Sequence, residues 1–365
     1  MTHAFILNDE TVLCRQTPNG WWPVQVPLPQ LDIDLTALSA AETQPAYQVS
    51  RVTLLESLAP NHWLVNDNSC QDEDNNPDQD SLTDFTTKNV HAVTTNTFTA
   101  QAAIAITYDY AITHNVALPK ILESADLENS HLKSNALNNN GLTNNSDERS
   151  SLKTDACAFI AYRLLITQLP VALSGQLSQA IQLLRWQTDT RFCSRCATPV
   201  VAATRGERAM VCPACRLRQY PRVQPCIITA ITRPNPQTGI MQILLAHHHR
   251  YGQQKTSAQA LQYGLIAGFV EVGESLEHAV VREVAEEVNI RLTDIRYVSS
   301  QPWPFPSNLM LGFRAAYAGG DIVIQEDELS HADFFDLTNL PKIPFKGSIA
   351  YELIAQIAHE QGITL

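Results

Sequence analysis

The sequence contains no uninterrupted run of 18 apolar residues, and its first residues, MTHAFILNDE, hold no basic cluster followed by a long apolar segment. A membrane-spanning helix needs about 20 apolar residues, and a secretory signal needs both of the missing features. An excess of positive charge is also lacking, since the formal net charge is −12. We therefore expect a cytoplasmic protein that does not enter a membrane and has no broad basic surface for nucleic acid.

The length of 365 residues predicts two or three domains. In residues 1–189, the apolar segments TVLCR and AYQVSRVTLLES predict strands, and a helix is expected later. Two polar stretches, near 66–90 and 123–154, are rich in Asn, Ser and charged residues, and we expect both to be disordered insertions. The pattern indicates an N-terminal α+β domain without a chemical motif.

Three local features of this N-terminal domain give further expectations. The pair Trp21-Trp22, next to a predicted turn at Asn19-Gly20, is expected to pack in the core. The segment TAQAAIAITYDYAITHN is apolar enough for a buried strand or a helix, and its pattern does not decide between them. Ser174-Gly175 is expected to interrupt the chain before a helix whose apolar face includes Leu177 and Ile181.

Four of the eight cysteines form two C-x-x-C pairs that are separated by fifteen residues, and the other four are scattered. A hairpin between the pairs can bring them together, and four thiolates complete a tetrahedral zinc site with no open position. The site is therefore predicted to be structural, with redox-active or unpaired thiols as the alternatives. The predicted zinc ribbon spans residues 190–220, and its ligands are Cys193, Cys196, Cys212 and Cys215.

Strand and helix signals alternate over residues 221–365. PCIITAIT and MQILLAHHH predict two strands, GLIAGFVEV leads into a helix, and IRYVSSQ and LMLGFRAAYA precede a last helix in GSIAYELIAQIAHE. Three consecutive histidines, 247–249, end the second strand. Because side chains alternate along a strand, they cannot all bind one ion, and we expect surface or substrate-rim positions for them.

The stretch GFVEVGESLEHAVVREVAEEVNI, residues 268–290, predicts a helix that Ser275 caps. The spacing places Glu283, Glu286 and Glu287 on one side of this helix. Like charges so placed repel by about a few tenths of a kcal/mol per pair, which a hard cation such as Mg²⁺ would reverse. Arg282 is expected to orient the carboxylates, and an acidic, solvated helix face is the alternative interpretation.

Residues 300–310 read SQPWPFPSNLM, in which three prolines alternate with other residues. Each proline fixes its own φ and restricts the preceding residue, so the segment is stiff and presents its side chains at little ordering cost. A rigid loop that packs Trp303 and Phe305 into the core is one interpretation. A preformed binding loop is the other.

A four-cysteine ribbon, then the stretch 268–290, then SQPWPFP resemble the NADH pyrophosphatases of the NudC-like Nudix family, over roughly residues 160–365. The stretch 268–290 resembles the Nudix box and departs from it at Asn289, where the family usually has glycine. Asparagine is the next-best residue for a left-handed helix cap, so the departure is mild. The family also usually has serine where Asn308 stands.

This resemblance implies an α+β fold, in which a Nudix α/β/α sandwich with a mixed sheet follows the ribbon and the N-terminal domain. It implies a homodimer in which residues from both subunits complete the active site at the interface. It also implies hydrolysis of the pyrophosphate bond of NADH or NAD⁺ to nicotinamide mononucleotide and AMP, and removal of NAD caps from RNA. The alternatives are a Nudix hydrolase of another nucleoside diphosphate derivative, such as ADP-ribose, and a zinc-ribbon nucleic-acid-binding protein with an inactive Nudix domain.

Functional positions can be carried over from the family residue by residue. The resemblance implies that Glu283, Glu286 and Glu287 are catalytic and hold Mg²⁺ or Mn²⁺. The carbonyl of Ala267 and the carboxylate of Glu328 are implied as further ligands of these cations. Substrate contacts fall on Tyr220, Glu207, Phe269, Gln301, Pro302, Trp303, Pro304, Phe305, Pro306, Ser307, Asn308 and Ala350.

Overall fold

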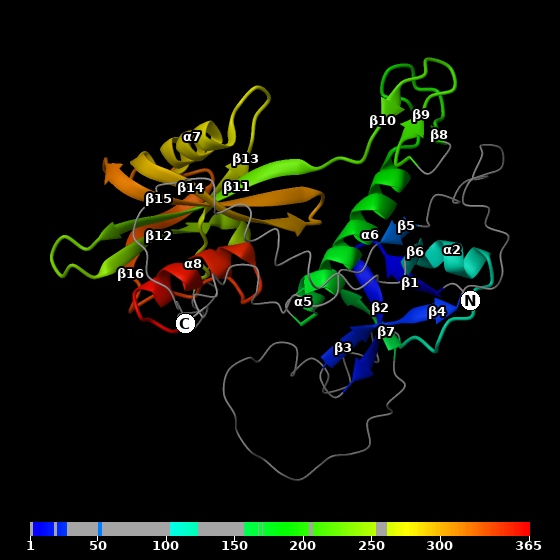
Figure 1. The fold of residues 1–365 in the computed structure, drawn as a ribbon, viewed down its shortest axis with the longest axis horizontal. Helices are drawn as coiled ribbons and strands as arrows, with labels where there is room; N and C mark the ends of the chain where they lie inside the picture. The colour runs from blue at the N-terminus through cyan, green and yellow to red at the C-terminus, as the bar shows by residue number, and fades with distance from the viewer. Residues whose placement is uncertain are drawn as a thin grey trace, which may run out of the picture. The chain divides into compact units, whose positions relative to one another are not determined.

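The computed structural model describes residues 3–17, 20–27, 50–52, 103–122, 157–166, 168–169, 171–203, 207–252 and 261–365. Both predicted polar insertions lie outside these residues, as do Asn19 of the predicted Asn19-Gly20 turn and most of AYQVSRVTLLES. The chain divides into two compact units, and the division falls between Arg222 and Val223 (Figure 1). The first unit contains the N-terminal sheet and the ribbon, and the second contains the large sheet that carries the box.

The sheet of the first unit has strand order β3-β2-β1-β6-β5, with β4 added to β1 and β7 added to β2. Strands β1 and β6 are parallel, and the other neighbours are antiparallel. The predicted strand TVLCR is confirmed as part of β2. The bounds are β1 (His3–Asn8), β2 (Thr11–Thr17), β3 (Gly20–Pro23), β4 (Gln25–Pro27), β5 (Ser50–Val52), β6 (Ala103–Thr107) and β7 (Cys157–Ala161).

The undecided segment TAQAAIAITYDYAITHN contains both a strand and a helix. Strand β6 passes directly into α2 (Tyr108–Thr113), because the Thr107 hydroxyl accepts the Tyr110 N–H at 3.2 Å and caps the helix. The core prediction for the tryptophan pair holds for Trp21, which is buried, and is wrong for Trp22, which is 46% exposed. The two residues are consecutive in β3 and therefore point to opposite faces.

The expected interruption at Ser174-Gly175 is wrong, because both residues lie inside α6 (Val171–Asp189). The Tyr162 hydroxyl, on the short helix α5 (Tyr162–Leu165), lies 2.6 Å from the Ser174 carbonyl oxygen and 2.7 Å from its Oγ. This buried tie holds α6 where a local signal predicted a break. The apolar face with Leu177 and Ile181 is buried as predicted. Within the described ranges, no helix combines the length and apolar character that crossing a membrane requires.

The ribbon contains three short antiparallel strands in the order β10-β9-β8. They are β8 (Val201–Ala202), β9 (Met210–Val211) and β10 (Arg218–Gln219). Buried Leu183 and Trp186 of α6 pack with Val200 and Met210. The ribbon therefore shares a small apolar cluster with the end of the helix that precedes it.

The sheet of the second unit has strand order β14-β15-β11-β12-β16, with β13 added to β11. It is mixed, since β11 and β15 are parallel and the other neighbours are antiparallel. The elements are β11 (Gln224–Pro234), β12 (Met241–His248), η2 (His249–Tyr251), β13 (Ile266–Phe269), α7 (Leu276–Val288), β14 (Arg291–Trp303), β15 (Asn308–Gly319), β16 (Leu329–Asp336) and α8 (Ile349–Glu360).

Helices α7 and α8 cover opposite faces of this sheet (Figure 1). The alternation of side chains along the buried strands explains the arrangement. In β12, Leu245 packs in the cluster that contains Leu353 of α8, whereas its neighbour Leu244 packs with Val284 of α7. The predicted α/β/α sandwich with a mixed sheet is confirmed, and its core lies on both faces of β11 and β12.

The end of α7 shows why the departure at Asn289 is tolerated. Asn289 has a left-handed backbone with φ 58°, and its N–H donates to the Ala285 carbonyl at 3.1 Å. Asparagine adopts this conformation at a lower cost than most residues other than glycine. The helix therefore ends as the box pattern requires.

Candidate metal and active sites

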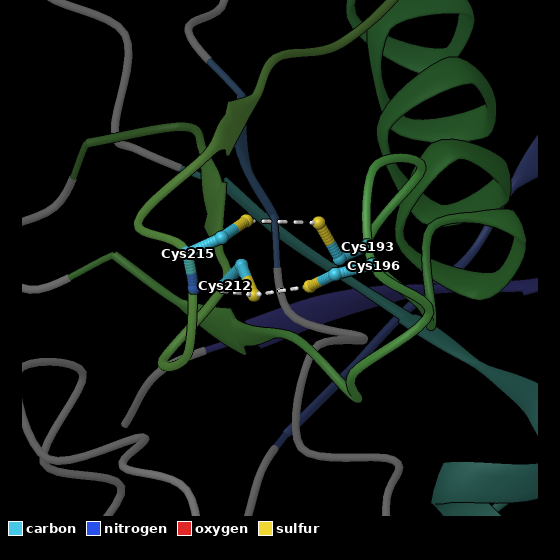
Figure 2. Close-up of side chains that lie close together, drawn as sticks. All are labelled: Cys193, Cys196, Cys212 and Cys215. Atoms are coloured by element: carbon cyan, nitrogen blue, oxygen red, sulfur yellow. Dashed lines mark hydrogen bonds between the residues drawn. The ribbon is translucent and has the colours of Figure 1, made fainter.

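The four cysteines of the ribbon converge, and their Sγ atoms all lie within 4.8 Å of one another (Figure 2). The Cys193–Cys215 and Cys196–Cys212 pairs are each separated by 3.5 Å between sulfur atoms. Tetrahedral zinc with Zn–S bonds of about 2.3 Å requires sulfur atoms roughly 3.8 Å apart. The donor set and its spacing therefore fit a structural zinc ion.

Two matching backbone turns present these thiols. In the first, the Ala197 N–H donates to the Cys193 carbonyl and Ala197 has φ 57°; in the second, Arg216 repeats both features with Cys212, at φ 60°. A backbone N–H also points at a sulfur in each turn, from Arg195 to Cys193 at 3.4 Å and from Cys215 to Cys212 at 3.3 Å. N–H groups so directed stabilise thiolates, which are the form that binds zinc.

The glutamates of the box lie on α7, whose start and buried face are as predicted. The Ser275 hydroxyl accepts the His278 N–H at 3.2 Å, and Val280, Val284 and Val288 are buried against the sheet. This packing fixes the rotation of the helix. Glu283 and Glu286 therefore lie beside the loop that follows β13.

Arg282 organises the carboxylates around it. Its Nε and Nη2 donate to the two oxygens of Glu274, at 2.9 Å each. Its Nη1 donates to Glu283 and to Glu286, at 3.0 Å each, and Nη2 also donates to the Phe269 carbonyl at 2.8 Å. One guanidinium thus ties the helix to the loop before it, in agreement with the expected orienting role.

Gly268 leaves the space that the Glu283 carboxylate occupies. A Cβ at position 268 would lie 1.9 Å from the carboxyl carbon of Glu283, far inside contact distance. The carboxylate therefore packs directly on the backbone of β13, one residue after Ala267. Burial raises the pKa of Glu283, against the opposing effect of Arg282.

Glu287 is the most buried carboxylate of the set, with 1% of its surface exposed. Burial, and then the negative charges of Glu283 and Glu328, raise its pKa to about 8. Among the described residues its Oε2 has no hydrogen-bond partner. A buried carboxylate among like charges fits a divalent cation, which would supply the missing positive charge.

Glu328 is held near this group by backbone contacts. The Gln325 N–H donates to the Glu287 carbonyl at 2.9 Å, and the Glu328 N–H returns to the Gln325 carbonyl at 3.0 Å. Within the described part of the chain, only the four cysteines gather three or more potential ligand atoms within 4.8 Å. The carboxylates of Glu283, Glu286, Glu287 and Glu328 therefore lie further apart than the four thiols do. The charges of the other three still act on Glu287, and Arg282 engages Glu283 and Glu286.

The expectation for the three histidines is wrong for two of them. His247 and His248 are buried, with 3% of each exposed, whereas His249 is exposed. The reason is that β12 lies between β11 and β16 and has a helix on each face. The His248 Nε2 lies 3.7 Å from Oε2 of Glu287, and burial lowers the pKa of His248 to about 4. Periodicity did not indicate this neighbour of the glutamates.

The segment SQPWPFP forms the tip of a β-hairpin. Residues 301–303 end β14, residues 304–307 turn, and Asn308 begins β15 opposite Trp303. The Trp303 ring meets Phe305 edge-on at 5.3 Å and stacks with Phe345 at 6.2 Å between centroids. Phe345, which is 40% exposed, is an aromatic neighbour that the sequence pattern did not single out.

Two of the implied substrate contacts have structural roles. The Gln301 side chain donates to the Gly347 carbonyl at 2.9 Å and accepts the Ile349 N–H at 2.8 Å, which fixes the start of α8. Ala350 is 9% exposed and packs in the core beneath that helix. A contact from Ala350 to substrate would therefore come from its backbone.

Three implied contacts outside the hairpin, Glu207, Tyr220 and Phe269, are exposed, whereas Pro304 within the hairpin is buried. In the first unit, the Tyr220 hydroxyl donates to Glu207 at 3.0 Å, and Arg218 pairs with the same carboxylate. In the second unit, Phe269 directly follows Gly268 and is 52% exposed. An exposed aromatic side chain beside a carboxylate cluster is available to stack on a planar ligand.

The chain matches two known families. The one described as NUDIX domain matches residues 225–357, and the NADH pyrophosphatase zinc ribbon domain matches residues 189–220. Among curated proteins, the NAD-capped RNA hydrolase NudC of Pseudomonas putida (strain W619) is 41% identical over 216 residues, which cover 59% of this chain and 73% of that protein.

A second relative and a solved structure give further comparisons. The NAD-capped RNA hydrolase NudC of Klebsiella pneumoniae (strain 342) is 46% identical over 178 residues, covering 48% of this chain and 63% of that protein. A NUDIX hydrolase from Nitrosomonas europaea is 23% identical with a TM-score of 0.37, covering 48% of this chain and 94% of that chain, a likeness too low to bear on the site.

The ribbon geometry predicts a metal-dependent local fold. The purified chain should contain about one zinc per molecule, and Cys212→Ser should lose it, because a three-thiolate site binds zinc more weakly and zinc binding is coupled to folding. Elemental analysis measures the zinc, and proteolysis at the ribbon measures its loosening. Cys14→Ala, which removes a buried thiol outside the ribbon, should keep the zinc. Folded wild-type protein without zinc would contradict the assignment.

The contact between Gly268 and Glu283 predicts a loss of cation binding. Gly268→Ala should displace the Glu283 carboxylate and weaken Mn²⁺ binding by about tenfold or more, because carboxylates are the preferred ligands of hard cations. Gly175→Ala is the control, since no described atom beyond its chain neighbours and the adjacent helix backbone lies within 4 Å of an added Cβ. Electron paramagnetic resonance titration gives the affinities. Unchanged Mn²⁺ binding in a folded Gly268→Ala variant would show that Glu283 is not a ligand.

Proposed function

The chain belongs to the NudC family of Nudix hydrolases, and we propose that it hydrolyses the pyrophosphate bond of NADH or NAD⁺ to nicotinamide mononucleotide and AMP. The same bond joins an NAD cap to RNA, and we propose capped RNA as a further substrate. One observation carries the proposal: a relative named as a NAD-capped RNA hydrolase is 41% identical over 216 residues, which cover 73% of it. The carboxylate set of the box is also complete.

The residues of the second unit suit this reaction. Glu283, Glu286, Glu287 and Glu328, with the Ala267 carbonyl, would hold Mg²⁺ or Mn²⁺, which supplies positive charge to the phosphates and lowers the pKa of a bound water. Arg282 keeps Glu283 and Glu286 in place. Either Glu286, 54% exposed at its side chain, or the buried Glu287 would accept the proton of the attacking water.

Groups other than these carboxylates must recognise the two nucleosides, because the cation site binds only the pyrophosphate. We propose that Phe269 stacks on one base. The hairpin tip, whose Trp303 lies against Phe305 and Phe345, would shape the dinucleotide pocket. Gln301 would act through the start of α8 rather than by touching the substrate, because both ends of its amide are engaged there.

Assembly and location follow from the same family. We propose a homodimer, in which Tyr220 and Glu207 of the first unit contribute to the substrate site. Exposed apolar side chains of the second unit, among them Val281 and Tyr297, are available to contact a second copy. The four-cysteine site, and the absence of disulfides among the described cysteines, support a reducing compartment such as the cytoplasm.

The test compares NADH, NAD⁺, ADP-ribose and NAD-capped RNA as substrates of the full chain loaded with Mg²⁺ or Mn²⁺. We expect NADH or NAD⁺ to be cleaved to the mononucleotides with a kcat/KM above that for ADP-ribose. Phe269→Ala should lower kcat/KM for NADH by about 10- to 100-fold, because stacking on a base is worth roughly 1–3 kcal/mol.

The matched control is Val272→Ala, which truncates a fully exposed side chain three residues further on, in the loop after β13, and should leave kcat/KM unchanged. Equal melting temperatures should show that neither variant affects folding. A preference for ADP-ribose would replace the proposed substrate with another nucleoside diphosphate derivative. Absence of hydrolysis with every substrate, in zinc-replete protein, would favour a binding protein.

A further inference from the structure

Strand β12 ends at His248, which lies on the α7 side of the sheet beside a register irregularity in β16. The register of β12 against β16 pairs His247 with His331 and His248 with Leu329, and it shifts between these two pairs. Leu244 and Ala246 face the α7 side of the sheet, so His248, two residues further, continues that row.

Glu287 meets this row from the other side. It lies on α7 between Val284 and Val288, both of which are fully buried against the sheet. The His248 Nε2 is 3.7 Å from the Glu287 Oε2, and each side chain is at most 3% exposed. That separation is longer than a hydrogen bond, for which about 2.7–3.2 Å is usual. A small adjustment of either side chain would bring the two atoms within hydrogen-bond distance.

If one oxygen of Glu287 binds a cation, the other is free to accept a hydrogen bond that orients the carboxylate. A ligating carboxylate is usually held by a hydrogen bond from a neighbouring group, which orients it, and losing such a bond typically lowers metal affinity by about 10- to 100-fold. Oε2 has no hydrogen-bond partner among the described residues. An imidazole N–H is a suitable donor, and ionisation of the carboxylate strengthens the bond.

We propose that His248 is a positioning residue whose Nε2–H donates to Oε2 of Glu287, and so fixes this glutamate as a ligand of the divalent cation. The inference rests on the proposed cation site, but not on which dinucleotide is hydrolysed. It also gives a reason for a histidine at a buried position in the sheet. An aliphatic side chain would fill the same space and leave the carboxylate without a donor.

The experiment measures Mn²⁺ affinity of the full chain by electron paramagnetic resonance, without substrate. His248→Met keeps much of the side-chain volume and removes the donor, and should weaken Mn²⁺ binding by about tenfold. His248→Gln keeps a side-chain N–H and should stay within about threefold of wild type. His331→Gln is the matched control, because this histidine lies on the neighbouring strand and contacts the Tyr263 hydroxyl instead.

Three results would overturn the proposal. His248→Met with wild-type affinity would exclude a role in cation binding. Equal weakening in His248→Met and His248→Gln would assign the effect to packing. Wild-type protein that binds no Mn²⁺ would overturn the proposed cation site and this inference with it, whereas normal wild-type binding together with an unaffected His248→Met would overturn the inference alone.

A measurement on the wild-type chain keeps the test valid if the variants do not fold. Nitrogen-15 spectra of labelled histidines distinguish the two imidazole tautomers. We expect His248 to carry its proton on Nε2 in the presence of Mg²⁺, with a resonance that shifts as Mg²⁺ is added. A proton on Nδ1 alone would leave no donor toward Glu287 and would overturn the proposal.

Discussion

The second unit is built around a buried carboxylate, Glu287, one oxygen of which has no hydrogen-bond partner among the described residues. Glu287 is 1% exposed, its pKa is raised to about 8, and three other glutamates add negative charge. Its neighbour Glu283 is kept in place by Arg282 and by the absence of a side chain at Gly268. An arrangement of this kind is costly in a protein without a cation and favourable in a protein that binds one.

The parts of this site that follow short-range rules could be predicted from the sequence. Helix α7 has a serine cap, a left-handed end at Asn289 and an apolar face at helical spacing, and each of these depends only on residues within a few positions. The zinc ribbon was predictable for a similar reason, because each C-x-x-C turn supplies two thiols by its own backbone geometry. The sandwich followed from the family resemblance and from the order of strands and helices.

The contacts that the sequence did not predict all join residues that are distant along the chain. His248 meets Glu287 because β12 is covered by α7, and Gln301 holds the start of α8, 46 residues further on. The helix α6 runs through Ser174-Gly175 because the buried Tyr162 hydroxyl binds there. In each case a tertiary partner changes the outcome of a local preference, and a single sequence contains no direct signal for such a partner.

The dependence of unfolding on pH tests this account most directly, in wild type and Glu287→Gln, with EDTA and with Mg²⁺. A carboxyl whose pKa rises from 4.5 to about 8 on folding stabilises the native state below pH 4.5, and that contribution is lost as pH rises toward 8, by up to about 1.4 kcal/mol per pH unit. In EDTA, wild type should therefore lose stability relative to Glu287→Gln over this range, and Mg²⁺ at pH 8 should stabilise wild type alone. Parallel pH curves in EDTA, or equal stabilisation of both proteins by Mg²⁺, would contradict a cation-dependent Glu287.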